Sequence, residues 1–355
     1  MKKTFTLIAI ILIISILIGF IAYKWYIKQI NIQTSSSSDL AEVEIEEGEG
    51  VKSVAIKLQT AGIIKSSDVF FLYVKLNGIA PKIQAGKFKI PQNLSIIEVS
   101  NFIQKASGND IWITIPEGLR FDEIASILDK YFLKEDNTKY NNEEFLDICL
   151  NPSSYELNLE ILENKPQERS LEGFIYPDTY NVKKDITSKE LVILFIQTLE
   201  DKFKKENVDI ESYDNLSPYE VLILASIIER EARTSEERYM ISDILQKRLR
   251  GELQGVKLLQ ADATLLYEAK DWKAVVTKEL KDKDTPYNTY KYTGLTPTPI
   301  CNPGIDSIEA SLDPTENEYF YYLHDDEGKI HYAKTNEEHV NNQRCFINKN
   351  KNYCL

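Results

Sequence analysis

Hydrophobic and polar positions change their pattern sharply near the start of the chain. Residues 5–23 contain no charged side chain, and Lys24, Trp25 and Lys28 follow directly after them. As a helix, this apolar run would span roughly 28 Å, which matches the hydrocarbon core of a bilayer, and the residues after it suit the membrane interface. The run is too long for a signal peptide and shows no small-residue cleavage site, so we expect an uncleaved single-pass anchor.

Beyond this anchor, one pattern of alternating residues occurs twice, 70 positions apart. Residues 43–48 (VEIEEG) match residues 113–118 (ITIPEG), and apolar positions downstream stay in register, as Leu58 does with Leu128. Each copy predicts an alternating strand, a tight Glu-Gly turn and an amphipathic helix with apolar residues at i, i+3, i+4 and i+7. Two copies of one small α/β unit suggest a module that presents a surface for binding.

Capping signals and periodicity predict the remaining elements. Ser95 and Glu98 form a capping box, and Ser217-Pro218-Tyr219-Glu220 is a stronger helix start with Pro at the first helical position. The polar stretch at residues 134–170, rich in Asn and Glu, suggests a hinge. Elsewhere we expect helices at 66–77, 188–205, 235–250 and after Thr335, a strand at 85–90, and a hairpin at 319–323 and 329–334. The fold class is therefore α+β.

The helix that Ser217 opens places an acid on its apolar stripe. Helical spacing puts Glu229 on one face with Leu222, Ala225, Ser226 and Ala232. Loss of hydration on that face disfavours the carboxylate and favours the protonated acid, as a general acid at neutral pH requires. Small residues at 225 and 226 would let a substrate come close. Alternatively, the helix ends near Glu229 and the acid meets water as an ordinary ion-pairing residue.

That alternative has three arginines within reach. They are Arg230, Arg233 and Arg238. Ion-pairing acids are much more common than catalytic ones, so periodicity alone favours the structural interpretation of Glu229.

Charge and cysteine content narrow the function classes. The net charge is −13 and the first acid is Asp39, so the acidic excess lies wholly after the predicted anchor. A chain without a basic footprint is not expected to bind nucleic acid. Cys149, Cys301, Cys345 and Cys354 form no CxxC pair, and no cluster has metal-ligand spacing, so we expect no metal and no cofactor. Outside the cell, Cys345 and Cys354 either pair or remain thiols.

Three polar, aromatic segments rich in Pro and Gly are typical of loops that line a cleft. They are residues 171–180, 259–264 and 286–304. The chain has 20 tyrosines, whose rings are suited to pack against sugar faces. Each segment alone is equally consistent with a structural turn.

Taken in order, these segments resemble the YceG-like family, the membrane-anchored endolytic murein transglycosylases. The resemblance covers roughly residues 40–343. Its motifs are IPEGLRFDEIA, LEGFIYPDTY, LASIIEREA, LQADATLLY, PYNTYKYTGLTPTPICNPGIDSIEASLDP and YFYYLHDDEGKIHYAKTNEEHVNN. Two positions depart from the family pattern, because Ala263 stands where Pro is usual and Glu268 where Gly is common.

The resemblance implies a domain organisation. It adds to the α+β class an N-terminal transmembrane helix, small LysM-like α/β modules and a C-terminal catalytic domain. The implied boundaries are a cytoplasmic tail at 1–4, the anchor at 5–23, a linker at 24–40, a LysM-like N-terminal module at 41–110, a second repeat unit and hinge at 111–165, the catalytic domain at 166–345 and a tail at 346–355.

The resemblance also implies a reaction. Such enzymes cut the β-1,4 bond between N-acetylmuramic acid and N-acetylglucosamine in nascent strands, leave 1,6-anhydro ends and so limit strand elongation. The family's catalytic acid falls on Glu229. One carboxyl group suffices, because it protonates the leaving oxygen and then deprotonates the C6 hydroxyl that attacks C1. Residues expected to contact the sugar or stabilise charge at C1 are Asp178, Gln260, Asp262, Asn288 and Tyr290.

Other polar residues near these motifs are expected to support the site. Glu172 and Glu231 would do so without carrying the chemistry, and Glu231 lies about 200° from Glu229 around the helix. Asp178 and Asp262 are equally typical of loop caps. His331 and His339 match family positions but are more typical of structural contacts near a hairpin.

The implied partners are peptidoglycan glycan strands, the lipid bilayer through residues 5–23, and peptidoglycan synthases. We expect the protein in the cell membrane, with its N-terminus in the cytoplasm and the bulk of the chain outside. Two alternatives remain. The protein is a non-catalytic peptidoglycan-binding scaffold, or it hydrolyses the strand with Glu229 and Asp262 as two carboxylates.

Overall fold

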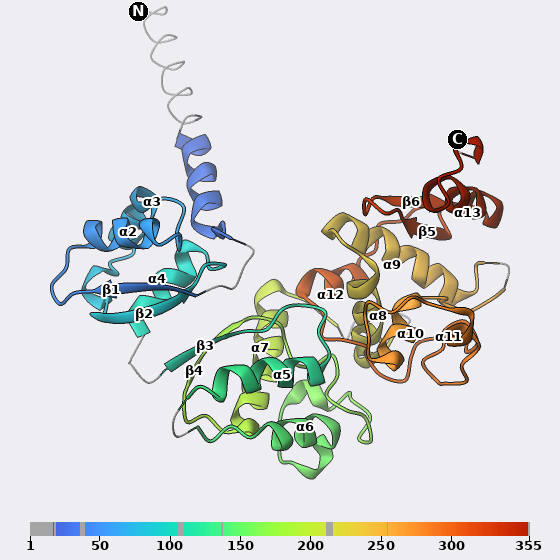
Figure 1. The fold of residues 1–355 in the computed structure, drawn as a ribbon, viewed down its shortest axis with the longest axis horizontal. Coiled ribbons are helices and arrows are strands. Elements are labelled where there is room, and N and C mark those ends of the chain that lie inside the picture. The colour runs from blue at the N-terminus through green and yellow to red at the C-terminus, as the bar shows by residue number, and fades with distance from the viewer. Residues whose placement is uncertain are drawn as a thin grey trace, which may run out of the picture. The chain divides into compact units, whose positions relative to one another are not determined.

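Two compact units make up the chain. The computed structural model describes residues 17, 19–35, 40–105, 110–135, 138–210, 216–253 and 255–353. The first unit comprises Met1–Thr114 and Tyr180–Lys184, and the second comprises Ile115–Thr179 and Asp185–Leu355. Figure 1 shows that small two-stranded sheets and many short helices build both, as expected for the α+β class.

The predicted anchor lies largely outside the described residues. Residues 19–31 are helical. Within the described part of the chain, no helix combines the length and the apolar character needed to cross a bilayer. The anchor at residues 5–23 therefore stays a prediction.

Alternation of side chains organises the first unit. Strand β1 (Leu40–Ile45) pairs antiparallel with β2 (Gly86–Pro91). Val43 and Ile45 point into the core, whereas Glu42 and Glu44 on the opposite face lie 3.3 and 3.7 Å from lysines of β2. Helices α2 (Val51–Thr60), α3 (Ser67–Leu76) and α4 (Ile96–Lys105), with the 3₁₀ turn η1 (Ala80–Lys82), complete this core.

The predicted repeat has the same local structure in both copies. In the second copy, β3 (Asp110–Thr114) pairs with β4 (Thr179–Lys183), and α5 (Phe121–Phe132) follows it. Gly48 and Gly118 have φ values of 78° and 76°, a left-handed conformation that glycine adopts without steric cost. The expected order of strand, Glu-Gly turn and helix is confirmed twice.

The second unit is mainly helical, and α8 lies at its centre. Helix α8 (Pro218–Glu231) packs against α9 (Ser235–Arg250), α10 (Asp262–Ala269) and α12 (Ile305–Leu312), as Figure 1 shows. The other elements are α6 (Asn142–Leu150), α7 (Ser188–Glu206), α11 (Lys278–Asp282), β5 (Tyr321–His324), β6 (Ile330–Ala333), α13 (Asn336–Asn342), the short π-helix η4 (Gln343–Ile347) and the 3₁₀ turn η5 (Lys351–Tyr353).

Helix starts occur where the capping signals predicted them. Ser217 and Glu220 form a reciprocal capping box, with Pro218 at the first helical position. The Thr335 hydroxyl accepts a hydrogen bond from the N–H of Glu338, and the predicted hairpin of β5 and β6 precedes it. These predictions are confirmed because caps depend on residues within one turn of the helix end.

The polar stretch at residues 134–170 is more ordered than a hinge. It contains α6 and the 3₁₀ turns η2 (Pro152–Ser154) and η3 (Glu160–Leu162). Phe145, Ile148 and Cys149 of α6 are fully buried. Three apolar residues at helical spacing inside a polar stretch were thus the overlooked signal, and through them α6 packs into the core.

The cysteines divide into two kinds. Cys345 is disulfide-bonded, whereas Cys149 and Cys301 are buried free thiols. Cys354, the partner that the sequence suggested for Cys345, lies outside the described residues. Within the described ranges, no three His, Cys, Asp or Glu side chains gather in a way that would hold a metal ion.

Candidate active site

Helix α8 carries Glu229 into a closed environment. Its preceding residues Leu222, Ala225 and Ser226 are at most 1% exposed, and the Glu229 side chain is 6% exposed. The predicted approach of a substrate at residues 225 and 226 is wrong. The N–H of Ile300 donates to the Ser226 hydroxyl at 2.9 Å, so the loop before α12 fills the space that the small side chains leave.

Polar donors surround the Glu229 carboxyl group. Arg238 Nη2 donates to Oε1 at 2.9 Å, while the Ser307 hydroxyl and the Gly304 N–H donate to Oε2 at 2.6 and 3.1 Å. Gly304 is the N-cap of α12 and Ser307 lies in its first turn, so the carboxyl group occupies the positive end of that helix. The ion pair with Arg238 is one of the three that the alternative interpretation offered, and it adds to the buried, apolar side of α8 a cation and a helix terminus, of which the sequence predicted only the cation.

Arg238 joins Glu229 to a second acid that the sequence argument overlooked. Its Nη2 lies 3.8 Å from Oε2 of Glu117, and its Nε donates to Ser307 at 2.9 Å. The Glu117 side chain is 51% exposed. The pKa of Glu117 is raised, mainly because part of its side chain is buried and secondly because Glu229 is negatively charged. The available signal was its place in the Glu-Gly turn of the second repeat.

Two glycines allow this close approach. A Cβ atom at Gly304 would lie 2.1 Å from Oε1 of Glu117, which is impossible without displacement of that acid. A Cβ atom at Gly118 would lie 3.6 Å from Cγ of Glu229 and 3.1 Å from Nη1 of Arg230. The turn of the second repeat and the start of α12 therefore meet around Glu229 because neither has a side chain there.

Glu172 and Asn302 bind together the loops that carry these groups. The Asn302 amide donates to Oε1 of Glu172 and to the Leu119 carbonyl, both at 2.9 Å. Oε1 of Glu172 also accepts the N–H of Phe121 at 3.0 Å. Complete burial raises the pKa of Glu172 to about 8. Glu172 thus lies where a supporting residue was predicted, and it acts through backbone positions rather than by contact with Glu229.

Asn302 also anchors the third loop. Its Oδ1 accepts the N–H groups of Gly173 and Ile175 at 3.0 and 2.9 Å, and its backbone carbonyl accepts the N–H of Gly118 at 2.9 Å. Asn302 is fully buried, and every polar group of its side chain is paired. One residue therefore fixes the Glu-Gly turn relative to the loop that precedes α12.

Glu231 faces a separate pocket at the end of α8. Its Oε1 accepts the N–H of Ala263 at 3.2 Å and its Oε2 accepts the Tyr322 hydroxyl at 3.0 Å; burial raises its pKa. The pocket has a volume of about 210 Å³. Its lining also includes Arg230, Arg233, Asp262, Leu266, Trp272 and His324.

The structure brings Asp262 and Tyr290 together beside that pocket. The Tyr290 hydroxyl donates to Oδ1 of Asp262 at 2.5 Å, and Lys281 Nζ lies 3.6 Å from the same oxygen. These contacts hold two predicted sugar ligands on the Glu231 side of α8, apart from the donors around Glu229. Gln260 is exposed, with a left-handed φ of 54°.

Other predicted ligands take part in structural contacts. Asn288 is fully buried and its amide donates to the carbonyls of Lys281 and Lys283 at 2.9 and 2.7 Å. Direct sugar contact by Asn288 is therefore wrong, because its polar groups shape its own loop. Asp178 pairs with Lys202 at 3.3 Å.

The two histidines singled out near the hairpin also make structural contacts. His331 lies 2.8 Å from Asp325 and stacks on Phe346. His339 stacks on Tyr321 and lies 3.0 Å from the Gln343 amide. The structural interpretation of both is confirmed.

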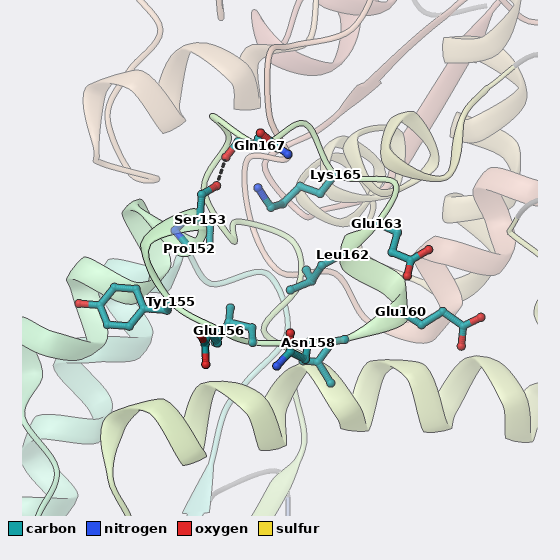
Figure 2. Close-up of a pocket in the computed structure, with 12 residues that line it drawn as sticks. Pro152, Ser153, Tyr155, Glu156, Asn158, Glu160, Leu162, Glu163, Lys165 and Gln167 are labelled. Atoms are coloured by element: carbon teal, nitrogen blue, oxygen red, sulfur yellow. Dashed lines mark hydrogen bonds between the residues drawn. The ribbon is translucent and has the colours of Figure 1, made fainter.

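A larger pocket lies in the segment between α6 and α7. It has a volume of about 790 Å³ and is lined by residues 152–167. Figure 2 shows that the Glu160 and Glu163 carboxylates point away from the Lys165 amino group. That amino group donates to the carbonyls of Pro166 and Arg169. None of the predicted sugar ligands lines this pocket, so size alone does not identify the active site.

Comparison with known proteins identifies the family to which this chain is similar. The model of the YceG-like family matches residues 43–345. The endolytic murein transglycosylase of Bacillus subtilis (strain 168) is 31% identical over 88% of this chain and 86% of that protein. The protein of the same name from Streptococcus pneumoniae (strain D39) is 28% identical over 94% of this chain and 63% of its own length. The crystal structure of a YceG-like protein from Listeria monocytogenes superposes with a TM-score of 0.55 at 27% identity, covering 86% of this chain and 99% of that one.

Proposed function

The chain belongs to the YceG-like family, and we propose that it is an endolytic murein transglycosylase with Glu229 as its catalytic acid. One observation carries this proposal. The Glu229 carboxyl group is 6% exposed, yet it is bonded to a guanidinium, a hydroxyl and a helix N-terminus beside a half-exposed acid. The substrate is peptidoglycan, and the products are strands that end in 1,6-anhydro-N-acetylmuramic acid.

The contacts of Glu229 have a role in each step of this reaction. The protonated acid gives its proton to the bridging O4, and the C1–O4 bond breaks with its electrons on O4. The O6 oxygen then bonds to C1, and its proton passes to the Glu229 carboxylate. Arg238, Ser307 and the Gly304 N–H stabilise that carboxylate between the two transfers. No water enters the product.

Ser307 suits both protonation states of Glu229. A hydroxyl donates one hydrogen bond and accepts others, so it can donate to the carboxylate and accept from the protonated acid. Its Oγ lies 2.6 Å from Oε2 and already accepts the Nε–H of Arg238. The contact is therefore kept while the proton moves.

Glu229→Gln tests the proposal directly. With the full chain acting on peptidoglycan, we expect the wild type to release fragments with anhydro ends, which mass spectrometry identifies as lighter by one water than hydrolysis products. The variant should keep its fold and lose about 10³-fold or more in rate, because proton transfer is lost. Fragments with reducing ends would indicate hydrolysis with Asp262, and binding without cleavage would indicate a scaffold.

We also propose that residues 5–23 anchor the protein in the cell membrane, with the bulk of the chain outside near peptidoglycan synthases. On the helix at residues 19–31, the side chains of Phe20, Ile21 and Trp25 are 56%, 59% and 56% exposed, as suits contact with lipid. The disulfide at Cys345 fits an oxidising compartment. Externally added protease should degrade the bulk of the chain in intact spheroplasts; protection would contradict this orientation.

Residues 41–110, which lie within the first unit, are the proposed LysM-like module that binds the strand. Its support is the strand–turn–helix repeat on a separate core. A chain that lacks residues 41–110 should keep its reaction chemistry and bind insoluble peptidoglycan more weakly. Equal binding in a sedimentation assay would contradict the module's role.

A further inference from the structure

We propose that Glu117 is the second carboxylate of the reaction, contacting the sugar ring and stabilising the positive charge that develops at C1 and O5. The inference rests on the proposed transglycosylase function. Its first support is the difference in solvent exposure between the two acids that contact Arg238. Glu229 is 6% exposed and bonded at both oxygens, whereas Glu117, which shares Arg238 Nη2 with it, is 51% exposed. Glu117 is thus the acid of the pair that a bound strand meets first.

The position of Glu117 is built by the fold rather than by a mobile surface side chain. The Gly118 N–H donates to the Asn302 carbonyl at 2.9 Å, which fixes the turn that carries Glu117. The Glu117 carboxyl group lies over Gly304, where any Cβ atom would collide with it. The same glycine donates its N–H to Glu229. Two carboxyl groups are therefore held at one helix N-terminus by one backbone position.

Charge balance in this cluster matches the chemistry. When Glu229 holds the transferable proton, the Glu117 carboxylate and the Arg238 guanidinium cancel. As O4 accepts that proton, Glu229 becomes a carboxylate, and the cluster carries one net negative charge while the sugar carries positive charge. Glu117 forms no covalent bond and takes no proton. Its contribution is electrostatic, and it is greatest in the transition state.

Neighbouring charges do not supply this role. Asp306, in the first turn of α12, and Lys202 also act on Glu117, with opposite signs, and both contribute less than Glu229. Glu231 accepts hydrogen bonds from Ala263 and Tyr322 on the other side of α8. Asp262 accepts a hydrogen bond from Tyr290 and pairs with Lys281 there. Glu117 is the carboxylate bound to the same guanidinium as Glu229.

Glu117→Gln in the full chain tests this inference. We expect kcat to fall about 10²-fold with little change in KM, because the amide keeps the shape but not the charge. The products should keep their anhydro ends. The alkaline limb of the pH–rate profile should move to lower pH, because the remaining acid no longer has a negative neighbour that favours its protonated form. A merely structural residue would not move that limb.

Matched variants complete the design. Glu47→Gln changes the equivalent acid in the first repeat copy and should leave both rate and pH profile unchanged. Glu117→Ala should recover activity when formate is added, since the small anion can occupy the vacated place.

The outcomes separate this inference from the proposed function. A Glu117→Gln variant with wild-type rate and profile overturns the role of Glu117, provided that Glu229→Gln is inactive. Absence of anhydro products from the wild type overturns the proposed function instead. If both Glu117 variants unfold at lower temperature than the wild type, formate rescue of Glu117→Ala decides, and failure of rescue counts against the inference.

Discussion

The two copies of the repeat have the same backbone and very different surroundings. Gly48 and Gly118 adopt the same left-handed turn, at φ 78° and 76°. A Cβ atom at Gly48 would meet no atom within 4 Å, whereas one at Gly118 would meet Glu229 and Arg230. The strand–turn–helix pattern therefore produces a turn in both places. Only the second copy contributes to the proposed active site, because α8 and the start of α12 pack against its turn.

The helices after the two turns are also stabilised differently. In the first copy, the contacts are local: Glu49 accepts hydrogen bonds from Ser53, Lys57 and the Glu46 N–H at 2.5, 2.9 and 3.0 Å. In the second copy, the N–H of Phe121 donates to Glu172, 51 positions along the chain. The turn of the first copy is thus stabilised by neighbouring residues, whereas the turn of the second copy is stabilised by hydrogen bonds to distant loops. Those hydrogen bonds also place Glu117 beside Glu229.

The largest expected difference between the copies is in catalysis. Gly118→Ala and Gly48→Ala should each destabilise the fold by about 1 kcal/mol, because both positions need a left-handed φ. Only Gly118→Ala should reduce the rate of strand cleavage, by about 10²-fold, since its new methyl group would lie 3.1 Å from Nη1 of Arg230 and would displace that side chain or the turn that carries Glu117. Steady-state kinetics on peptidoglycan measures this. Equal rates for the two variants would mean that the close packing at Gly118 has no catalytic role.

A second difference lies in the pH dependence of stability. The pKa of Glu172 is raised to about 8, above the value of about 4.3 expected when unfolded. Its contribution is therefore complete below about pH 4 and is lost as pH rises toward about 8. Glu172→Gln, which stays neutral, should flatten the decline of the unfolding midpoint between pH 5 and 8. An unchanged slope would show that Glu172 is ionised in the folded protein.

The smallest effect is expected in the first copy, with the opposite sign. Hydrogen bonding from Lys57 is the main cause that lowers the pKa of Glu49 to about 2. Its contribution is present above about pH 4.3 and is lost as pH falls toward 2. Glu49→Gln should lower the unfolding midpoint at pH 7 by no more than a few degrees and leave activity unchanged, because its partner Lys57 is 36% exposed and water screens the pair. Calorimetry at pH 7 and pH 3 checks this, and a loss of activity would contradict the separation of the two copies.

Errors in the sequence interpretation share one cause. Ala225 and Ser226 suggested an open groove, but the loop at Ile300 packs there. Asn288 suggested a sugar ligand, but its amide bonds the backbone of its own loop. In both cases the residue type was compatible with either role, and the outcome depended on which loop backbone came to lie within hydrogen-bond distance of the side chain.

The sequence by itself determined the caps, the turns, the repeat and the burial of Glu229, because each depends on residues within one or two helical turns. Only the tertiary structure decided what surrounds that acid. Arg238 lies nine residues beyond it in the chain, on the next helix, but Glu117 and the start of α12 come from segments far away. Whether such segments meet depends on glycines that let backbones approach and on one buried Asn302 that joins three loops. Patterns among neighbouring residues do not predict contacts between segments that lie far apart in the sequence.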